Sequence, residues 1–520
     1  MRRRQVLTVD ALLRTRLRAL IVVLVALCAH GCATVPFDEP KTPSFALADT
    51  ADTDFGRAAN GWAELHDGRS GFFPLVQGMD ALGARLDLIE QAEKSIDLQY
   101  FLMKDDTAGY AIGHALIRAA DRGVRVRFLL DDVFTTVSDR MLYTLSQHPN
   151  VEVRLFNPVA RRGFYALNFV ASFRRANRRM HNKSFTVDNA ISIVGGRNIA
   201  DEYFQLKDDA VFSDFDILAL GDIAKAVSTS FDIYWNHALA VPIETLVGDR
   251  EAEALREERT AIAEKASAAY QGVYATAVSS ELLQALTSGE QTLYPATARV
   301  LADDPDKLNN PVSVEFMGLV TDIDTVLREA EREVTFISPY YVPVRNGVRY
   351  LRELGSRGVR VSVVTNSLAS NNHVPVHSAY SGYRKDVIRA GVNLYEARAN
   401  AGDEMQAKDG PASMTLHTKL ILIDRRYVFV GSLNLDPRSI EINAEMGLLI
   451  ESTELASLVA DGLDAALPVA TWKVTLDDGN ALRWQGLVKG NPVTLTSEPL
   501  ASRWLRFKAW LLKVAPESQL

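Results

Sequence analysis

A four-residue pattern that occurs twice constrains this chain more than any other feature. In each copy a lysine lies two positions after a histidine, an aspartate five positions after the lysine, and an asparagine ten positions after the aspartate. The copies consist of His181, Lys183, Asp188 and Asn198, and of His417, Lys419, Asp424 and Asn434. Because such a pattern would rarely arise twice by chance, the chain contains two related halves.

The pattern combines the residue types that phosphodiester transfer needs. One histidine can attack phosphorus while the other protonates the leaving oxygen. The lysines can neutralise the phosphate oxygens without a metal, and the asparagines can add neutral donors. Histidine and lysine two positions apart project from the same side of a strand, so the two pairs converge on one site if the halves pack about a pseudo-twofold axis. Asp188 and Asp424 fall at strand ends, where we expect structural support.

Carboxylates at equivalent places after the two motifs are candidates to orient the histidines. An acting imidazole needs a partner on its other ring nitrogen. Asp214 follows the first motif and Glu445 follows the second, while Asp216 competes with Asp214 for the first role. A surface position is the alternative for each carboxylate.

The doubled pattern resembles the HKD motif of the phospholipase D superfamily. Finer features resemble bacterial cardiolipin synthases of the C type, namely the segments at 178–185, 304–307, 434–439 and 516–520. The resemblance covers roughly residues 81–520. It implies a covalent phosphohistidine, with His181 preferred as the nucleophile and His417 as the proton donor; the reverse assignment stays open.

The function that this resemblance implies is a phosphatidyltransferase that makes cardiolipin from phospholipids, without a cofactor or a metal. A phospholipase D-type hydrolase that releases phosphatidic acid would share every catalytic residue. A nuclease is disfavoured because the net charge is −8, whereas nucleic-acid-binding domains are usually basic. A non-enzymatic lipid-binding scaffold is the alternative of a different class, against which the complete motifs count.

The order of predicted elements repeats along the chain. Strand patterns at 95–101 and 334–337 each precede a helical pattern and then a strand that follows Gly123 or Gly358. Gly123 precedes His181 by 58 residues and Gly358 precedes His417 by 59. Strands that alternate with helices predict an α/β fold. We expect two pseudo-twofold-related halves, each a mixed β-sheet flanked by helices in which parallel strands predominate.

The predicted domains follow from these patterns and from composition. We expect a lipoprotein-type signal segment at 1–32, a tether at 33–70, an N-terminal half at 71–245, a helical connection at 246–312, a C-terminal half at 313–465, and a β-hairpin region with a C-terminal helix at 466–520.

The N-terminus has the composition of an export signal. A basic stretch precedes an apolar run of eleven residues at 19–29, which is short for a membrane span. Residues 29–32 resemble a bacterial lipobox with Cys32 as the lipidated residue. A signal anchor and an ordinary signal peptide are the alternatives. Cys28 and Cys32 are the chain's two cysteines, so the body has no disulfide framework. We expect a membrane-attached protein of the bacterial cell envelope with its catalytic body exported.

A second pair of histidines, His373 and His377, lies outside the motifs. Two histidines four positions apart suggest a metal only on a helix, and Pro375 between them predicts a loop instead. The adjoining segment resembles the family's pocket wall. By that resemblance His377, Tyr380 and Arg384 would contact a lipid headgroup; a solvated loop is the alternative.

Two segments mix basic and aromatic residues. The segment at 156–179 leads into His181, and a predicted helix at 503–513 lies near the C-terminus. Such a composition suits a membrane surface of anionic lipid. Each segment could equally pack one face against the core. For the C-terminal helix we prefer burial.

Overall fold

The computed structural model describes residues 35–161, 165–207, 211–247, 249–279, 293–401, 414–514 and 517. The predicted signal segment, with Cys28 and Cys32, lies outside these residues. Among the helices of the described ranges, none combines the length and apolar character that crossing a bilayer requires.

The first half is built on a mixed sheet whose strands lie in the spatial order β1, β8, β6, β5, β2, β3, β4, β9. Their bounds are β1 Ser70–Leu75, β2 Ser95–Tyr100, β3 Arg125–Asp131, β4 Val151–Phe156, β5 Ser184–Val187, β6 Ile191–Gly195, β8 Asp216–Leu220 and β9 Ala240–Pro242. Its helices are α2 Asp54–Leu65, α3 Gly78–Gln91, α4 Thr107–Asp121, α5 Asp139–Ser146, α6 Tyr165–Ala171, α7 Phe173–Ala176, α8 Asp222–Trp235 and α9 Ile243–Leu246.

The second half repeats this order as β10, β17, β16, β15, β11, β12, β13, β18. The strands are β10 Tyr294–Ala302, β11 Glu333–Ile337, β12 Arg360–Asn366, β13 Asn393–Ala397, β15 Leu420–Ile423, β16 Tyr427–Gly431, β17 Met446–Glu451 and β18 Thr471–Leu476. The helices are α12 Gly318–Arg328, α13 Val344–Ser356, α14 Val374–Arg389 and α16 Thr453–Ala470. The matching orders confirm the predicted α/β repeat.

Parallel strands do not predominate, however, and that expectation is wrong. In each half only β2, β3 and β4, or β11, β12 and β13, run parallel. Helical crossovers join just these strands, whereas the strands that follow each motif turn back as the antiparallel hairpins β5–β6 and β15–β16. The motifs therefore lie where the parallel part of each sheet meets its antiparallel part.

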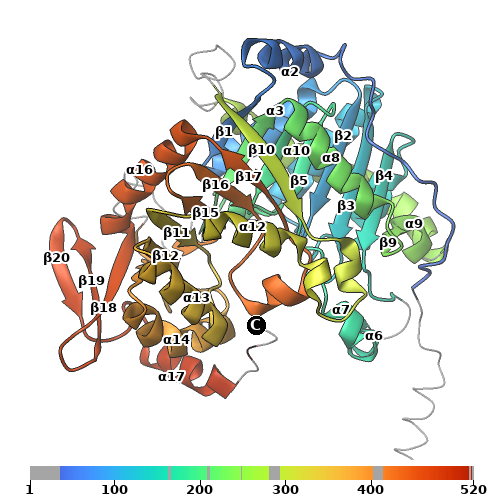
Figure 1. The fold of residues 1–520 in the computed structure, drawn as a ribbon. Helices are drawn as coiled ribbons and strands as arrows, with labels where there is room; N and C mark the ends of the chain where they lie inside the picture. The colour runs from blue at the N-terminus through green and yellow to red at the C-terminus, as the bar shows by residue number, and fades with distance from the viewer. Residues whose placement is uncertain are drawn as a thin grey trace, which may run out of the picture.

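Strand β10 joins the two halves into one sheet (Figure 1). It pairs with β1 through Tyr294–Ala296 and with β17 from Thr297 to Ala302. The predicted connection at 246–312 is therefore only partly helical. Its helix α10, Asp249–Val278, packs Tyr270 and Val273 into the core of the first half. β10 was missed because its stability comes from partners on both edges, which a local pattern does not reveal.

The segment predicted as a tether is ordered along the first half from residue 35 onward. Lys41 donates from Nζ to the carbonyl of His237 at 2.7 Å, and Arg127 donates to the carbonyl of Ser44 at 2.8 Å. Helix α2 follows, capped by Thr53. The tether prediction is wrong for these residues because isolated polar contacts hold the segment, and such contacts leave no periodic signal in the sequence.

The C-terminal region contains β19 Leu482–Val488, β20 Asn491–Leu495 and α17 Arg503–Leu511, which confirms the predicted hairpins and helix. The expected burial of that helix is wrong. Ala509 is its buried residue, whereas Trp504 and Trp510 are 70% and 65% exposed. A short helix at the edge of the fold turns only a narrow stripe inward, so most of its apolar residues face outward.

Candidate active site

Each motif histidine is held by the backbone of the opposite half. His181 donates its N–H to the carbonyl of Ala444 at 2.8 Å, and His417 donates its N–H to the carbonyl of Ser213 at 2.7 Å. The second contact extends a parallel pairing of β7, Val211–Ser213, with β14, Met414–Leu416. The first adjoins a parallel bridge between Met180 and Ala444. Each motif is thus bonded to the half that does not contain it, and the two contacts are equivalent.

The same exchange gives each histidine a carboxylate from the other half. His181 Nδ1 lies 2.8 Å from Glu445 Oε2, and His417 Nδ1 lies 2.6 Å from Asp214 Oδ2. The sequence indicated both carboxylates but not this crossed pairing. The competing residue, Asp216, instead binds the buried guanidinium of Arg85 at 2.8 Å. It is therefore occupied in the core and does not orient a histidine.

Small residues in the motifs make room for these carboxylates. A side chain at Gly196 would collide with the carboxylate of Asp214. At the equivalent place in the second half, the hydroxyl of Ser432 donates to Glu445 Oε2. The glycine-glycine and glycine-serine steps in the two motifs therefore match the carboxylates that lie against them.

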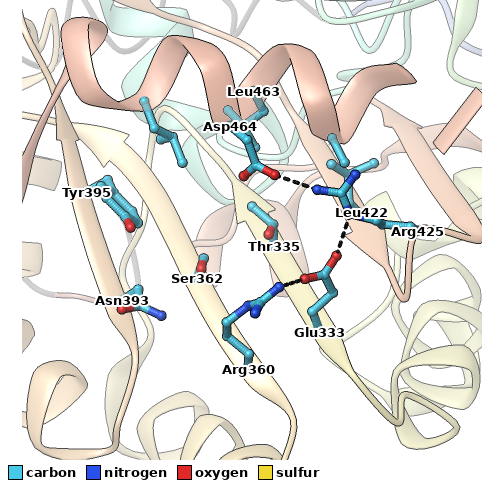
Figure 2. Close-up of a pocket in the computed structure, with 12 residues that line it drawn as sticks. Glu333, Thr335, Arg360, Ser362, Asn393, Tyr395, Leu422, Arg425, Leu463 and Asp464 are labelled. Atoms are coloured by element: carbon cyan, nitrogen blue, oxygen red, sulfur yellow. Dashed lines mark hydrogen bonds and ion pairs between the residues drawn. The ribbon is translucent and has the colours of Figure 1, made fainter. Parts of the chain in front are cut away.

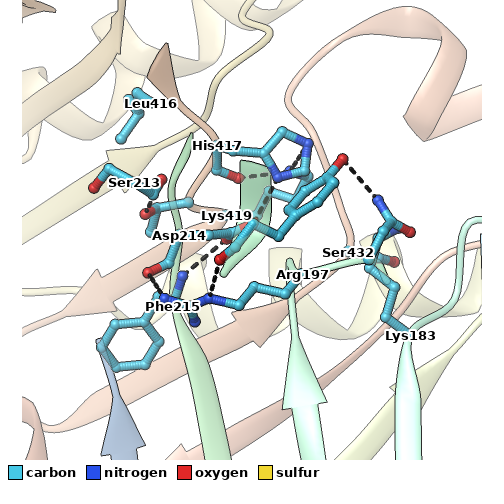
Figure 3. Close-up of polar contacts among 12 residues, drawn as sticks. Lys183, Arg197, Ser213, Asp214, Phe215, Leu416, His417, Lys419 and Ser432 are labelled. Carbon is cyan, nitrogen blue, oxygen red and sulfur yellow. Dashed lines mark hydrogen bonds and ion pairs between the residues drawn. The ribbon is translucent and has the colours of Figure 1, made fainter. Parts of the chain in front are cut away.

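Both motif lysines are buried, and Figure 3 shows Lys419 beside His417. Lys183 Nζ donates to the carbonyl of His181 at 2.6 Å, and Lys419 Nζ donates to the carbonyl of His417 at 2.6 Å. Burial lowers the pKa of Lys183 to about 7 and that of Lys419 to about 8. The two lysines therefore lose their positive charges readily as the pH rises through 7 and 8.

Burial also favours the neutral form of both histidines. The pKa of His181 lies well below its ordinary value because of burial and the charges of Lys183 and Lys419. Burial and the same two lysines lower the pKa of His417 to about 4. Since each lysine acts on both rings, the four side chains form one electrostatic site. A neutral ring that donates from Nδ1 to its carboxylate leaves Nε2 free to act as a nucleophile.

The two carboxylates differ in their protonation. Burial raises the pKa of Glu445 to about 7. Burial acts on Asp214 in the same direction, but its interaction with His417, which includes a hydrogen bond, and the charge of Lys419 outweigh burial and hold the pKa of Asp214 below its ordinary value. Asp214 is therefore an anion near neutral pH, where Glu445 can exchange a proton.

Aromatic rings that the sequence analysis missed line the histidines. The ring of Phe101 meets His181 edge-on with centroids 4.7 Å apart. Phe212 stacks on His417 at 5.2 Å, and Tyr203 meets the same ring edge-on at 5.1 Å. Phe101 is the last residue of the predicted strand at 95–101, and Phe212 lies two positions before Asp214, so these positions were the available signal.

The motif asparagines lie beside the site with different partners. Asn198 donates from Nδ2 to the hydroxyl of Tyr203 at 2.9 Å. Asn434 donates to the hydroxyl of Ser439 at 3.4 Å, and within the described residues its buried Oδ1 has no hydrogen-bond partner. Asn198 is therefore linked to His417 through the ring of Tyr203.

Asp188 and Asp424 lie in the turns between the hairpin strands that follow the motifs. Each has a left-handed backbone, with φ of 48° and 54°. Asp188 accepts three backbone N–H groups, from Glu93, Lys94 and Ser95. Asp424 accepts the equivalent three, from Glu331, Arg332 and Glu333. These contacts indicate a structural role. They fix the starts of the parallel strands β2 and β11 against the hairpins that follow the motifs.

The second histidine pair lies at the start of a helix, so the predicted loop is wrong. Pro375 falls in the first turn of α14, where a proline removes no helical hydrogen bond. His377, Tyr380 and Arg384 are buried there. Arg384 binds Glu396 at 2.6 Å and lies 3.1 Å from His377 Nε2. Their contact with a headgroup stays a prediction, because the contacts in the structure are with other protein groups.

Potential metal ligands do not gather in the described part of the chain. No group of three or more histidine, cysteine, aspartate or glutamate side chains within it could hold a metal ion. His373 and His377 lie within this part of the chain.

A small cavity lies away from the histidines, between the second sheet and α16 (Figure 2). It is lined at one end by Glu333, Arg360 and Asn393, which begin the parallel strands β11, β12 and β13. The opposite end of β12 approaches the site, since Asn366 bonds to the backbone of Leu416, next to His417. The cavity therefore does not belong to the candidate active site.

Comparisons with known proteins agree with the doubled geometry. The family model described as cardiolipin synthase, PLD-like domain, matches residues 86–235 and 323–466. Cardiolipin synthase C of Escherichia coli is 36% identical over 455 residues, which cover 87% of this chain and 96% of that protein. Cardiolipin synthase A of Pseudomonas syringae is 27% identical over 399 residues, covering 76% of this chain and 68% of that protein.

Among solved structures, phosphatidylserine synthase of Haemophilus influenzae has the same fold. It superposes with a TM-score of 0.52 and covers 79% of this chain and 91% of that chain, at 14% sequence identity. At that identity the likeness concerns the fold alone.

Proposed function

The chain belongs to the cardiolipin synthase family with phospholipase D-like domains, and from this premise we propose that it transfers a phosphatidyl group between phospholipids to form cardiolipin. The observation that carries the proposal is the crossed pair of histidine–carboxylate contacts, His181 with Glu445 and His417 with Asp214. Two oriented imidazoles beside two buried lysines provide a nucleophile, an acid and charge for one phosphodiester.

His181 is the nucleophile and His417 the proton donor. The anionic Asp214 stabilises a positively charged His417, which an acid must be before it gives up its proton. Glu445, with a pKa of about 7, can accept the Nδ1 proton of His181 as that ring gains phosphorus. The difference between the carboxylates thus supports the assignment that the resemblance favoured.

The first transfer takes the phosphatidyl group from a donor such as phosphatidylglycerol. The positive charges of the lysines lower the pKa of His417. The anionic phosphodiester offsets these charges, so binding of the substrate favours protonation of the His417 ring. Nε2 of His181 attacks phosphorus, and the bond from phosphorus to the headgroup oxygen breaks. His417 protonates that oxygen, and free glycerol leaves.

The second transfer reverses these roles at His417. A headgroup hydroxyl of a second phospholipid gives its proton to the now neutral His417 as its oxygen attacks phosphorus. The bond between phosphorus and His181 breaks with its electron pair left on Nε2, and Glu445 returns the Nδ1 proton, which restores the neutral nucleophile. The product carries two phosphatidyl groups on one glycerol when the acceptor is phosphatidylglycerol. Lys183 and Lys419 balance the charge on the non-bridging oxygens in both steps.

Hydrolysis differs only in the acceptor, so product analysis tests the proposal. Purified protein is mixed with labelled phosphatidylglycerol, with and without phosphatidylethanolamine, and the lipids are resolved. We expect labelled cardiolipin. Phosphatidic acid as the main product would replace the proposal by a hydrolase, and an absence of any product would favour a lipid-binding scaffold.

For location, we propose attachment to a membrane of the bacterial cell envelope through lipidated Cys32, with the catalytic body exported. The support is the sequence of residues 1–32, with its basic stretch, short apolar run and lipobox-like end. Fatty-acid labelling should mark the wild type and vanish in Cys32→Ala. An unlabelled wild type that keeps residues 1–31 would instead be held by a signal anchor.

A further inference from the structure

Helix α17 carries an apolar face that nothing in the described part of the chain covers. Trp504, Phe507, Trp510 and Leu511 lie on one side of the helix, with exposed fractions of 70%, 49%, 65% and 54%. The three rings follow one another with centroid separations of 5.7 and 6.0 Å. A contiguous exposed apolar surface of this kind marks an interaction site.

The other side of α17 packs against the second half. Leu505 and Ala509 of the helix form a small cluster with Leu368, two residues after strand β12, and with Val374 at the start of α14. β12 ends at Asn366, whose amide makes two hydrogen bonds, of 2.8 and 3.0 Å, to the backbone of Leu416. Leu416 directly precedes His417. The exposed rings therefore lie on an element that packs against the support of one catalytic histidine.

Basic side chains accompany the rings. Arg503 and Lys508 are exposed on α17, and Lys513 is exposed just after it. Among the residues that the structure describes, none of these three makes an ion pair. Tryptophan prefers the headgroup level of a bilayer, and lysine or arginine beside it attracts anionic lipid. The composition therefore suits an anionic phospholipid surface better than a protein partner, whose interface would be depleted of lysine.

A second exposed patch lies on the first half. Val170 is 69% and Phe173 is 47% exposed, and Arg174 beside them is also exposed. These residues belong to α6 and α7, and α7 ends five residues before His181. Helices α17, α6 and α7 lie along the same lower side of the molecule in Figure 1. The first patch is thus linked to His417 through the residues at the end of β12, and the second lies shortly before His181 in the chain.

We propose that α17, together with α6 and α7, docks on an anionic phospholipid bilayer and so presents both histidines to the headgroups. The choice of a lipid surface rests on the proposed function. The docking helix lies far along the chain from Cys32, so it orients the body on the membrane rather than tethering it. A protein without this contact would remain attached and yet meet bilayer substrate poorly.

The first test detects ring insertion directly. Full-length protein is reconstituted in vesicles of phosphatidylglycerol and phosphatidylcholine whose acyl chains carry bromine, which quenches tryptophan fluorescence on contact. The wild type should be quenched, and the variant W504F/W510F should lose at least half of the quenching. The control variant W472F, which removes a buried ring, should keep it. An unquenched wild type would overturn the proposal, whether or not α17 then pairs with a second copy.

The second test separates docking from chemistry. The variant W504S/W510S should turn over vesicle phosphatidylglycerol about fivefold or more slowly than the wild type. Its turnover of dissolved short-chain phosphatidylglycerol should stay within about twofold. An equal loss on both substrates would assign α17 a structural role and overturn docking. If the wild type makes no cardiolipin, the proposed function fails, while the quenching result still decides whether α17 inserts.

Discussion

Glu445 Oε2 lies 2.8 Å from His181 Nδ1, although 264 residues separate the two in the sequence. The contact joins the second half to the motif of the first, and Asp214 makes the reciprocal contact to His417. Neither half therefore contains a complete histidine–carboxylate pair. Catalysis by the two histidines therefore depends on the packing of the two halves against each other.

Replacement of either motif histidine should abolish turnover. His181→Ala and His417→Ala remove partners that act as one unit, so each single loss should equal the loss in the double variant. Label from a phosphatidyl-labelled donor should remain on denatured wild-type protein and be absent from His181→Ala. Label that persists in His181→Ala but not in His417→Ala would reverse the assignment of nucleophile and acid.

Activity should fall as the pH rises through the pKa values of the buried lysines. Lys183 and Lys419, with pKa values of about 7 and about 8, are charged below those values and neutral above them. Because kcat/KM reports the free enzyme, it should decline between roughly pH 7 and 9. In Lys419→Arg the second charge persists, so the decline should span a narrower range at lower absolute activity. A flat profile over this range would show that neither lysine charge is needed.

The repeat, most element bounds and both motifs could be predicted because they leave local patterns. Strand β2, Ser95–Tyr100, falls within the predicted strand at 95–101. Strand β11, Glu333–Ile337, likewise contains the predicted strand at 334–337. The pairing of Asp214 with His417 could not be predicted, since it depends on how the halves pack.

Other features could not be predicted from the sequence for related reasons. β10 is defined by partners from both halves. Lys41 holds the segment predicted as a tether through contacts of its side chain with carbonyls that are distant in the sequence, such as that of His237. The helix that contains His377 was missed because Pro375 was treated as a helix breaker rather than as a first-turn residue.

Loss of Asp188 should destabilise the fold more than loss of Asp424. Each carboxylate accepts three backbone N–H groups, but Asp188 is fully buried, whereas two of the three contacts of Asp424 are exposed to water. Asp188→Ala should lower the free energy of unfolding by about 3 kcal/mol, measured by denaturant titration. Asp188→Asn, which keeps an acceptor and tolerates the left-handed backbone, should lose less. Equal losses for Asp188→Ala and Asp424→Ala would contradict this reading.

Chelation should leave activity unchanged. The two lysines supply the positive charge that a bound metal supplies in other phosphoryl-transfer sites. Cardiolipin formation is measured after dialysis against a strong chelator and again after individual divalent cations are added back. Activity that is lost and then restored by one particular cation would return attention to a metal site in this protein.

Gly196→Ser should impair catalysis even though serine occupies the equivalent position in the second half. A side chain at Gly196 would collide with the carboxylate of Asp214 and so displace it from His417. A misplaced orienting carboxylate weakens the acid, and we expect kcat to fall by about 100-fold, in the range for loss of general acid catalysis. The matched variant Ser432→Gly removes a hydroxyl without adding a clash. It should cost less, because Glu445 keeps its contact with His181. Similar kcat values for Gly196→Ser and the wild type, with both proteins folded, would show that the position of Asp214 does not control His417.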